Sequence, residues 1–187
     1  KAAKALDGAV AKELPPLKLD KARFSTRLDP LPEDQWGAFG AERVGFELAA
    51  NPGSPPGPLQ RVASGGELAR VMLALRVVLA GATAVPTLVF DEVDSGVSGA
   101  TAAAVGERLA RLGREMQVLV VTHSPQVAAR GLQHLKVEKT SARDATATRV
   151  AELAPDARRE EIARMLAGAK ITDEARAAAD KLLAGEG

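Results

Sequence analysis

The stretch Thr87-Leu88-Val89-Phe90-Asp91-Glu92 decides the fold class of this chain. Four largely apolar, strand-forming residues run directly into two carboxylates. A short apolar run of this kind suits a strand of a parallel sheet that is buried on both faces. Because ligands of open α/β sheets bind beyond the carboxyl ends of the strands, Asp91 and Glu92 are placed where a site for phosphate and a metal ion would lie.

Helices and strands alternate on both sides of this strand. The pattern predicts, in order, a helix over 65–80, the strand over 85–90, a helix over 98–112, a strand over 116–121 and a short helix near 126–130. This alternation predicts an α/β fold, with a mostly parallel sheet flanked by helices.

Further elements lie before and after this alternating region. An Ala-rich helix over 1–14 ends at Pro15-Pro16, and alternating polarity predicts two antiparallel strands over 22–28 and 43–48. A later hairpin is expected from 133–138 and 147–153 around a polar turn at 140–146, followed by helices over 157–166 and 172–183.

The composition excludes several classes of function. The 187 residues carry a net charge of +1, so no charge excess points to nucleic acid or an anionic membrane. Aromatic residues make up 3% of the chain, which argues against a surface that stacks single-stranded bases. The absence of Cys and the presence of only two His exclude disulfides, thiolate metal sites and a His-rich metal site. With no apolar segment of membrane-spanning length and no signal peptide, we expect a soluble, cytoplasmic domain.

Ser64-Gly65-Gly66-Glu67 opens the helix at 65–80. A capping box accounts for Ser64 and Glu67, since each side chain satisfies a free backbone donor. It does not account for two glycines in the first turn, each of which costs roughly 0.5–1 kcal/mol relative to Ala. Glycine lets a ligand approach the backbone closely, and a helix N-terminus suits a phosphate. Both interpretations stay open at this point.

Polar residues also follow the strands. Asp91 could hold Mg²⁺ while Glu92 orients or deprotonates water, although two acids ending a strand can simply be solvated or cap a turn. Asp94-Ser-Gly-Val-Ser98-Gly99 is either a turn leading to a helix cap or a loop that touches a partner subunit. Thr122-His123 directly follows the strand 116–121, which points to a site that His123 shares with Asp91, whereas we interpret His134 as structural.

The segment Gly168-Ala-Lys170-Ile-Thr172 does not form a phosphate loop. That motif requires Lys next to the second Gly and a strand leading into it, and neither is present. We expect a helix–helix connection there.

Taken in order, these motifs resemble the ATP-binding-cassette (ABC) ATPase head. Ser64 to Glu67 resembles the ABC signature, Thr87 to Glu92 the Walker B strand with its glutamate, Asp94 to Gly99 the D-loop, and His123 the switch histidine. Val62-Ala-Ser-Gly-Gly-Glu-Leu-Ala-Arg70, Phe90-Asp-Glu-Val-Asp-Ser-Gly-Val-Ser-Gly99 and Val120-Val-Thr-His-Ser-Pro-Gln-Val-Ala128 closely resemble the RecN family of bacterial DNA repair proteins, which is related to the structural-maintenance-of-chromosomes (SMC) proteins.

The resemblance implies a split head. Residues 15–187 correspond to its C-terminal half and 1–14 to the end of a coiled-coil helix, while the phosphate loop belongs to an N-terminal half. The resemblance implies that Asp91 holds Mg²⁺, that Glu92 is the base or orients water, and that His123 senses the γ-phosphate. Ser64, Gly65, Gly66 and Glu67 would face ATP bound by a second head, and Asp94 and Ser98 would contact that partner. Many ABC ATPases have Asp where this chain has Ser98, so a partner-contact or capping role is assigned there.

The implied partners are the N-terminal half of the same head, a second head and DNA, with ATP and Mg²⁺ as cofactors and no membrane. The implied function is ATP-dependent head dimerisation in double-strand-break repair and recombination, in the nucleoid-containing cytoplasm. We expect the chain alone to bind ATP poorly and to hydrolyse it negligibly. Three alternatives remain: the head of another SMC-type ATPase, a non-catalytic dimerisation module, and a metal-dependent hydrolase without nucleotide, which too few metal ligands disfavour.

Overall fold

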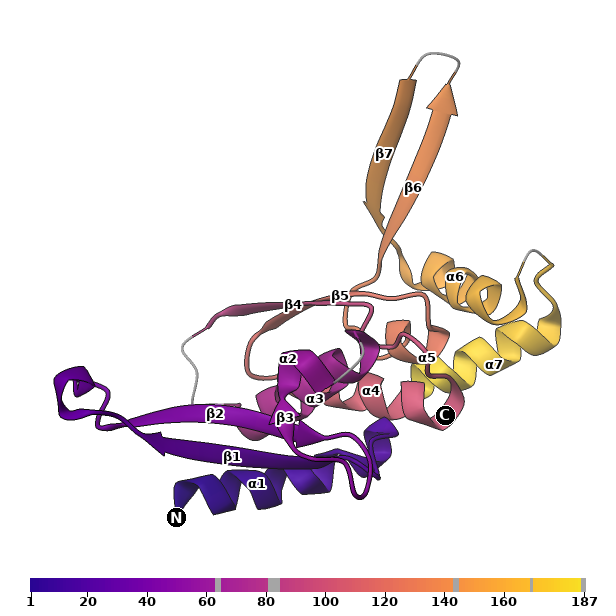
Figure 1. Ribbon diagram of the computed structural model, residues 1–187. Coiled ribbons are helices and arrows are strands. Elements are labelled where there is room, and N and C mark those ends of the chain that lie inside the picture. The colour runs from indigo at the N-terminus through magenta and orange to yellow at the C-terminus, as the bar shows by residue number, and fades with distance from the viewer. Residues whose placement is uncertain (63–64, 81–84, 143–144, 169, 186–187) are drawn as a thin grey trace.

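The centre of the fold is a pair of parallel strands. The structure, a computed structural model, describes residues 1–62, 65–80, 85–142, 145–168 and 170–185. Strand β4 (Thr87–Asp91) pairs with β5 (Gln117–Val121), from Thr87 opposite Gln117 to Asp91 opposite Val121. Helix α4 (Gly99–Leu112) connects the two strands (Figure 1). The predicted parallel pairing is therefore confirmed.

This pair is buried on one face only. Leu88, Val118 and Val120 pack against the core. The alternate residues Val89, Leu119 and Val121 are 66%, 45% and 61% exposed, because successive side chains of a strand point to opposite faces. The expectation that β4 is buried on both faces is wrong for the described residues, since none of them covers this second face.

An antiparallel sheet lies on the other side of the helices. Strand β1 (Arg23–Pro30) pairs with β2 (Glu42–Ala49), which pairs with the short β3 (Gly57–Pro58). The 3-10 turn η2 (Glu33–Gln35) lies at the tip of the β1–β2 hairpin, at the far end of the molecule from β6 and β7 (Figure 1). The two predicted strands are confirmed, and each is longer than expected.

Helix α1 (Ala2–Glu13) and the 3-10 turn η1 (Pro15–Leu17) pack against this sheet. Asp7 Oδ1 on α1 accepts hydrogen bonds from the backbone N and the Oγ1 of Thr26 at 2.8 and 2.7 Å. Val10 is completely buried. The predicted helix is confirmed, and it is part of the body of the fold. Its assignment to the end of a coiled coil stays a prediction.

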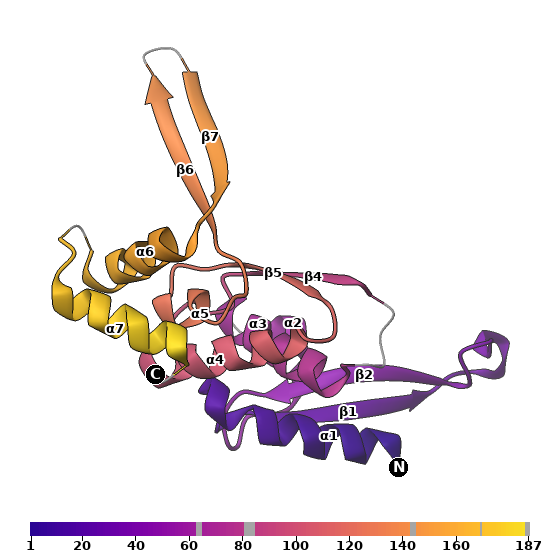
Figure 2. The same cartoon turned by 180° about the vertical axis from the view of Figure 1, so that it is seen from behind.

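Helices α2 (Leu59–Val62) and α3 (Gly65–Val78) lie between the two sheets (Figures 1 and 2). Helix α3 buries Val71, Leu73 and Val77, and α4 buries Val105 and Leu109. These side chains form one hydrophobic core with residues from α1, β1, β2 and β4. The core thereby fixes the N-terminus of α3 and the end of β4 relative to each other.

The C-terminal part is a hairpin followed by a pair of helices. After α5 (Pro125–Ala128), strands β6 (Leu135–Ala142) and β7 (Ala145–Glu152) form an antiparallel hairpin that projects from the body in both views (Figures 1 and 2). Helices α6 (Pro155–Ala167) and α7 (Asp173–Ala184) pack on each other around Ile162 and Ala179. The strands continue through the polar residues that were predicted to form the turn, because backbone pairing extends to Ala142 and Ala145.

The predicted α/β class is confirmed. In the described residues the parallel part is a single pair of strands, and the other two sheets are antiparallel. Gly168 and residues 170–172 lie between α6 and α7 as expected, and Thr172 Oγ1 caps α7 by accepting a hydrogen bond from Ala175 N at 3.3 Å.

Candidate nucleotide site

The predicted site residues Asp91, Glu92 and His123 lie at the carboxyl ends of two paired strands. Asp91 is the last residue of β4 and lies opposite Val121, the last residue of β5. Glu92 and His123 follow within two residues of those ends, and the side chains of all three residues are exposed. Parallel pairing therefore brings the imidazole of His123 to the same edge of the sheet as two carboxylates that lie more than thirty residues earlier in the sequence.

Glu92 adopts an unusual backbone conformation. Its φ is 54°, in the left-handed region that residues with a Cβ seldom adopt. The Glu92 carbonyl accepts a hydrogen bond from Ser95 N at 3.0 Å, which closes a turn directly after the strand. Backbone strain of this kind is concentrated at functional sites, where the surrounding structure enforces it.

The loop after Glu92 is anchored in the interior by Asp94. The side chain of Asp94 is completely buried, and its Oδ2 accepts a hydrogen bond from Thr122 Oγ1 at the end of β5. A surface contact with a partner was expected for Asp94, but its carboxylate lies inside the chain. Ser98 is exposed and is the N-cap residue of α4, and its side chain makes no capping hydrogen bond.

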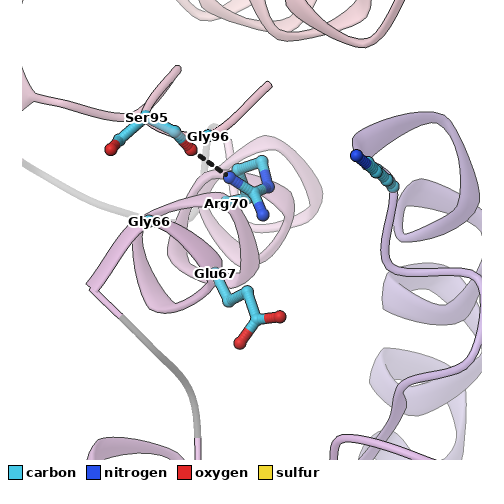
Figure 3. A pocket seen from close by; sticks show the side chains of 6 residues that line it. Gly66, Glu67, Arg70, Ser95 and Gly96 are labelled. Carbon is cyan, nitrogen blue, oxygen red and sulfur yellow. Dashed lines mark hydrogen bonds between the residues drawn. The ribbon is translucent and has the colours of Figure 1, made fainter. Parts of the chain in front are cut away.

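The N-terminus of α3 packs directly against this loop. A Cβ at Gly66 would lie 2.9 Å from the carbonyl oxygen of Ser95, which is closer than real Cβ atoms approach. Four residues along α3, Arg70 Nη1 donates a hydrogen bond to the same carbonyl at 3.0 Å (Figure 3). Gly66 therefore has a structural reason within this chain. For Gly65 the described residues give no such reason, because none of them lies within 4 Å of a Cβ added there.

Arg70 is a buried cation whose role none of the sequence motifs revealed. It is 5% exposed, and burial lowers its pKa while the charge of Glu67 acts in the opposite direction. A hollow of about 420 Å³ is lined by Lys18, Gly66, Glu67, Arg70, Ser95 and Gly96. The spacing of four residues between Gly66 and Arg70, which places both on one helix face, is the sequence signal that could have revealed it.

Ser64 lies outside the described residues, so the capping box that involves it is not tested. Gly65, Gly66 and Glu67 form the first turn of α3, as predicted. The N-terminus of this helix is the positive end of the helix dipole, which favours an anion.

His134 lies apart from this site, at the base of the β6–β7 hairpin. Burial and the positive charges of Arg158 and Lys136 lower its pKa, against the effect of Glu161. Its carbonyl accepts a hydrogen bond from Leu153 N at 2.9 Å. These contacts agree with the structural role that we predicted.

Among the described residues, no group of three or more His, Asp or Glu side chains is arranged to hold a metal ion. Helices within the same part of the chain are all too short or too polar to cross a membrane.

Comparison with known proteins identifies the family. No family model matches the chain. The DNA repair protein RecN of Xylella fastidiosa (strain Temecula1) is 47% identical over 183 residues, which cover 98% of this chain and 33% of that protein. The DNA repair protein RecN of Streptomyces coelicolor is 46% identical over 192 residues, which cover 97% of this chain and 34% of that protein. The chain belongs to the RecN family.

The chain spans about a third of the length of these RecN relatives and corresponds to their C-terminal part. Solved structures agree on the fold. The Smc head domain of Pyrococcus yayanosii, with its coiled coil and joint, matches with a TM-score of 0.61 at 22% identity, over 85% of this chain and 28% of that one. A structure described as "Structural biochemistry of ATP-driven dimerization and DNA stimulated activation of SMC ATPases" matches with a TM-score of 0.53 at 18% identity, over 90% of this chain and 96% of that one. The RecN-family segment therefore has the fold of an SMC head.

Proposed function

We propose that this chain supplies one part of an ATP-hydrolysing head that acts in DNA double-strand-break repair and recombination. The observation that carries the proposal is the meeting of Asp91, Glu92 and His123 at the adjoining ends of β4 and β5. The RecN relatives are named as DNA repair proteins, and the matched SMC heads support an ATPase. Nothing in the net charge of this chain contributes to the DNA role, which rests on the relatives alone.

Asp91, Glu92 and His123 fit one part of a site for ATP and Mg²⁺, not a complete site. Mg²⁺ is commonly bound through one or two carboxylates together with phosphate oxygens and water, and it neutralises charge on the phosphates during transfer. Asp91 would hold the ion, directly or through water. Glu92, next to it, would orient or deprotonate the attacking water. His123, on the neighbouring strand end, would contact the γ-phosphate.

The N-terminus of α3 supports a second contact, with ATP held by another head. None of the described residues lies within 4 Å of a Cβ added at Gly65, which leaves room on their side for a phosphate to approach the backbone. Gly65, Gly66 and Glu67 would face that nucleotide together with Ser64, and Ser98, exposed at the start of α4, would contact the partner head. ATP binding would then close the dimer and hydrolysis would open it, because the phosphate belongs to the interface.

The exposed face of β4 and β5 supports docking of the N-terminal half of the same head. Val89, Leu119 and Val121 form an apolar surface on the side of the sheet that carries Asp91. Burying such a surface is favourable by about 25 cal/mol per Å² of apolar area. A second sheet element placed here would complete the site beside Asp91 and Glu92.

Replacement of Glu92 by Gln tests this function. In a full-length protein, Glu92→Gln keeps the shape of the side chain but removes the carboxylate, so ATP binding should persist while kcat falls at least about 10²-fold. Glu33→Gln, at the tip of the β1–β2 hairpin, is the matched control and should hydrolyse ATP at the normal rate. Normal turnover by Glu92→Gln would show that Glu92 is not the base.

A further inference from the structure

The backbone on both sides of His123 is held by one hydroxyl group. Thr122 Oγ1 accepts a hydrogen bond from Ser124 N at 2.9 Å, which closes a short turn with His123 at its centre. The hydroxyl of Ser124 donates in turn to Gln126 Oε1 at 2.9 Å, in the first turn of α5. The imidazole of His123 is exposed, so its position depends on the geometry of this turn.

The same hydroxyl ties the turn to the loop that carries Glu92. A hydroxyl has one proton to donate and lone pairs to accept with. Thr122 Oγ1 accepts a hydrogen bond from Ser124 N, and the same hydroxyl donates its proton to Oδ2 of Asp94, two residues after Glu92. One side chain thus joins the end of β5 to the end of β4 at the level of the candidate site.

The buried position of the Asp94 carboxylate is energetically unfavourable. It is completely buried, and its second oxygen, Oδ1, has no hydrogen-bond partner in the described part of the chain. An unsatisfied buried oxygen is destabilising. Because Asp94 has no exposed surface, it acts on the neighbouring loop through Thr122 and not directly on a bound molecule.

We propose that Asp94 and Thr122 are positioning residues, which set the place of His123 relative to Glu92. This inference rests on the proposed ATPase function. Residues of this kind hold the reacting groups in register without touching the nucleotide. Breaking the link therefore lowers the rate of the chemical step and leaves nucleotide binding largely intact.

A pair of Thr122 variants tests the proposal in full-length protein. Thr122→Val has the same shape without the hydroxyl, and misplacement of His123 should lower kcat by about 10- to 100-fold with KM within about 2-fold. Thr122→Ser keeps the hydroxyl and should restore kcat. Thr87→Val is the matched control, since it removes a hydrogen bond between the same two strands, from Thr87 Oγ1 to Gln117 Oε1, at their opposite ends.

Hydrogen exchange gives a second measurement that does not depend on activity. The Ser124 amide should exchange faster in Thr122→Val than in wild type, and at the wild-type rate in Thr122→Ser. Thr122 is the position to vary because, unlike Asp94, it is not a buried charged group whose loss would disturb folding. Equal kcat in Thr122→Val and Thr87→Val, or unchanged exchange, would overturn the positioning role. Wild-type protein without ATP hydrolysis would instead refute the proposed function, while the exchange result would still decide whether Thr122 holds the turn.

Discussion

At the scale of single residues, the most informative position is Glu92. The pattern of an apolar strand followed by Asp91-Glu92 placed both acids at a strand end, and the structure confirms that placement. The φ of 54° at Glu92 was not predictable, because left-handed backbone at a residue other than Gly, Asn or Asp is imposed by the loop that follows. The buried link between Asp94 and Thr122 was equally beyond prediction, since it joins two residues that are 28 positions apart in the sequence.

The strain at Glu92 has a measurable consequence. At φ 54° a Cβ is costly and glycine is not, so Glu92→Gly should be more stable to urea than Glu92→Ala by roughly 0.5–1 kcal/mol. At Glu107, inside α4, the order should reverse, because glycine weakens a helix. The same order at both positions would show that the loop relaxes and that Glu92 stores no strain.

At the scale of elements, the two glycines in the first turn of α3 have different roles. The sequence left a capping box and a ligand-binding helix end both open, and the family resemblance implied that both glycines face a phosphate. The structure assigns Gly66 to a close contact with the Ser95 carbonyl and leaves Gly65 open. Helical and strand positions were predictable from periodicity, whereas this contact depends on how α3 and the loop after β4 are brought together by the shared core.

Alanine substitution of each glycine distinguishes the two roles. Gly66→Ala should lower the free energy of unfolding by about 1–3 kcal/mol, because the Cβ meets a backbone atom at 2.9 Å. Gly65→Ala should leave stability unchanged or slightly higher, since Ala is the better helix former. In full-length protein Gly65→Ala should nonetheless weaken ATP-dependent dimerisation, as measured by sizing with and without ATP. Equal losses of stability in both variants would contradict this division.

At the scale of the whole molecule, the described residues leave the second face of the β4–β5 pair uncovered. The continuous apolar run at 87–90 was interpreted as a strand buried on both faces, and Val89 is instead 66% exposed. The sequence pattern agrees with the proposal that another segment of the head covers this face. The described residues supply the cover for one face only.

We therefore expect the chain to need a second segment for activity. The chain alone should not hydrolyse ATP measurably, and addition of the N-terminal half of a RecN-family protein should give turnover. Lys at both Val89 and Leu119 should prevent this, because two charges would be buried without partners. Leu132→Lys, at a residue that is 92% exposed elsewhere, is the control and should be complemented normally. Turnover by the chain alone would contradict the split site.

The sequence by itself determined most of the helices and strands, the α/β class and the placement of Asp91, Glu92 and His123 at strand ends, because periodicity and strand direction are local properties. Only the tertiary structure decided which side chains hold those residues in place. The burial of Arg70 and Asp94, the close approach at Gly66 and the exposed face at Val89 all depend on contacts between segments distant in the chain, whose geometry no local pattern records.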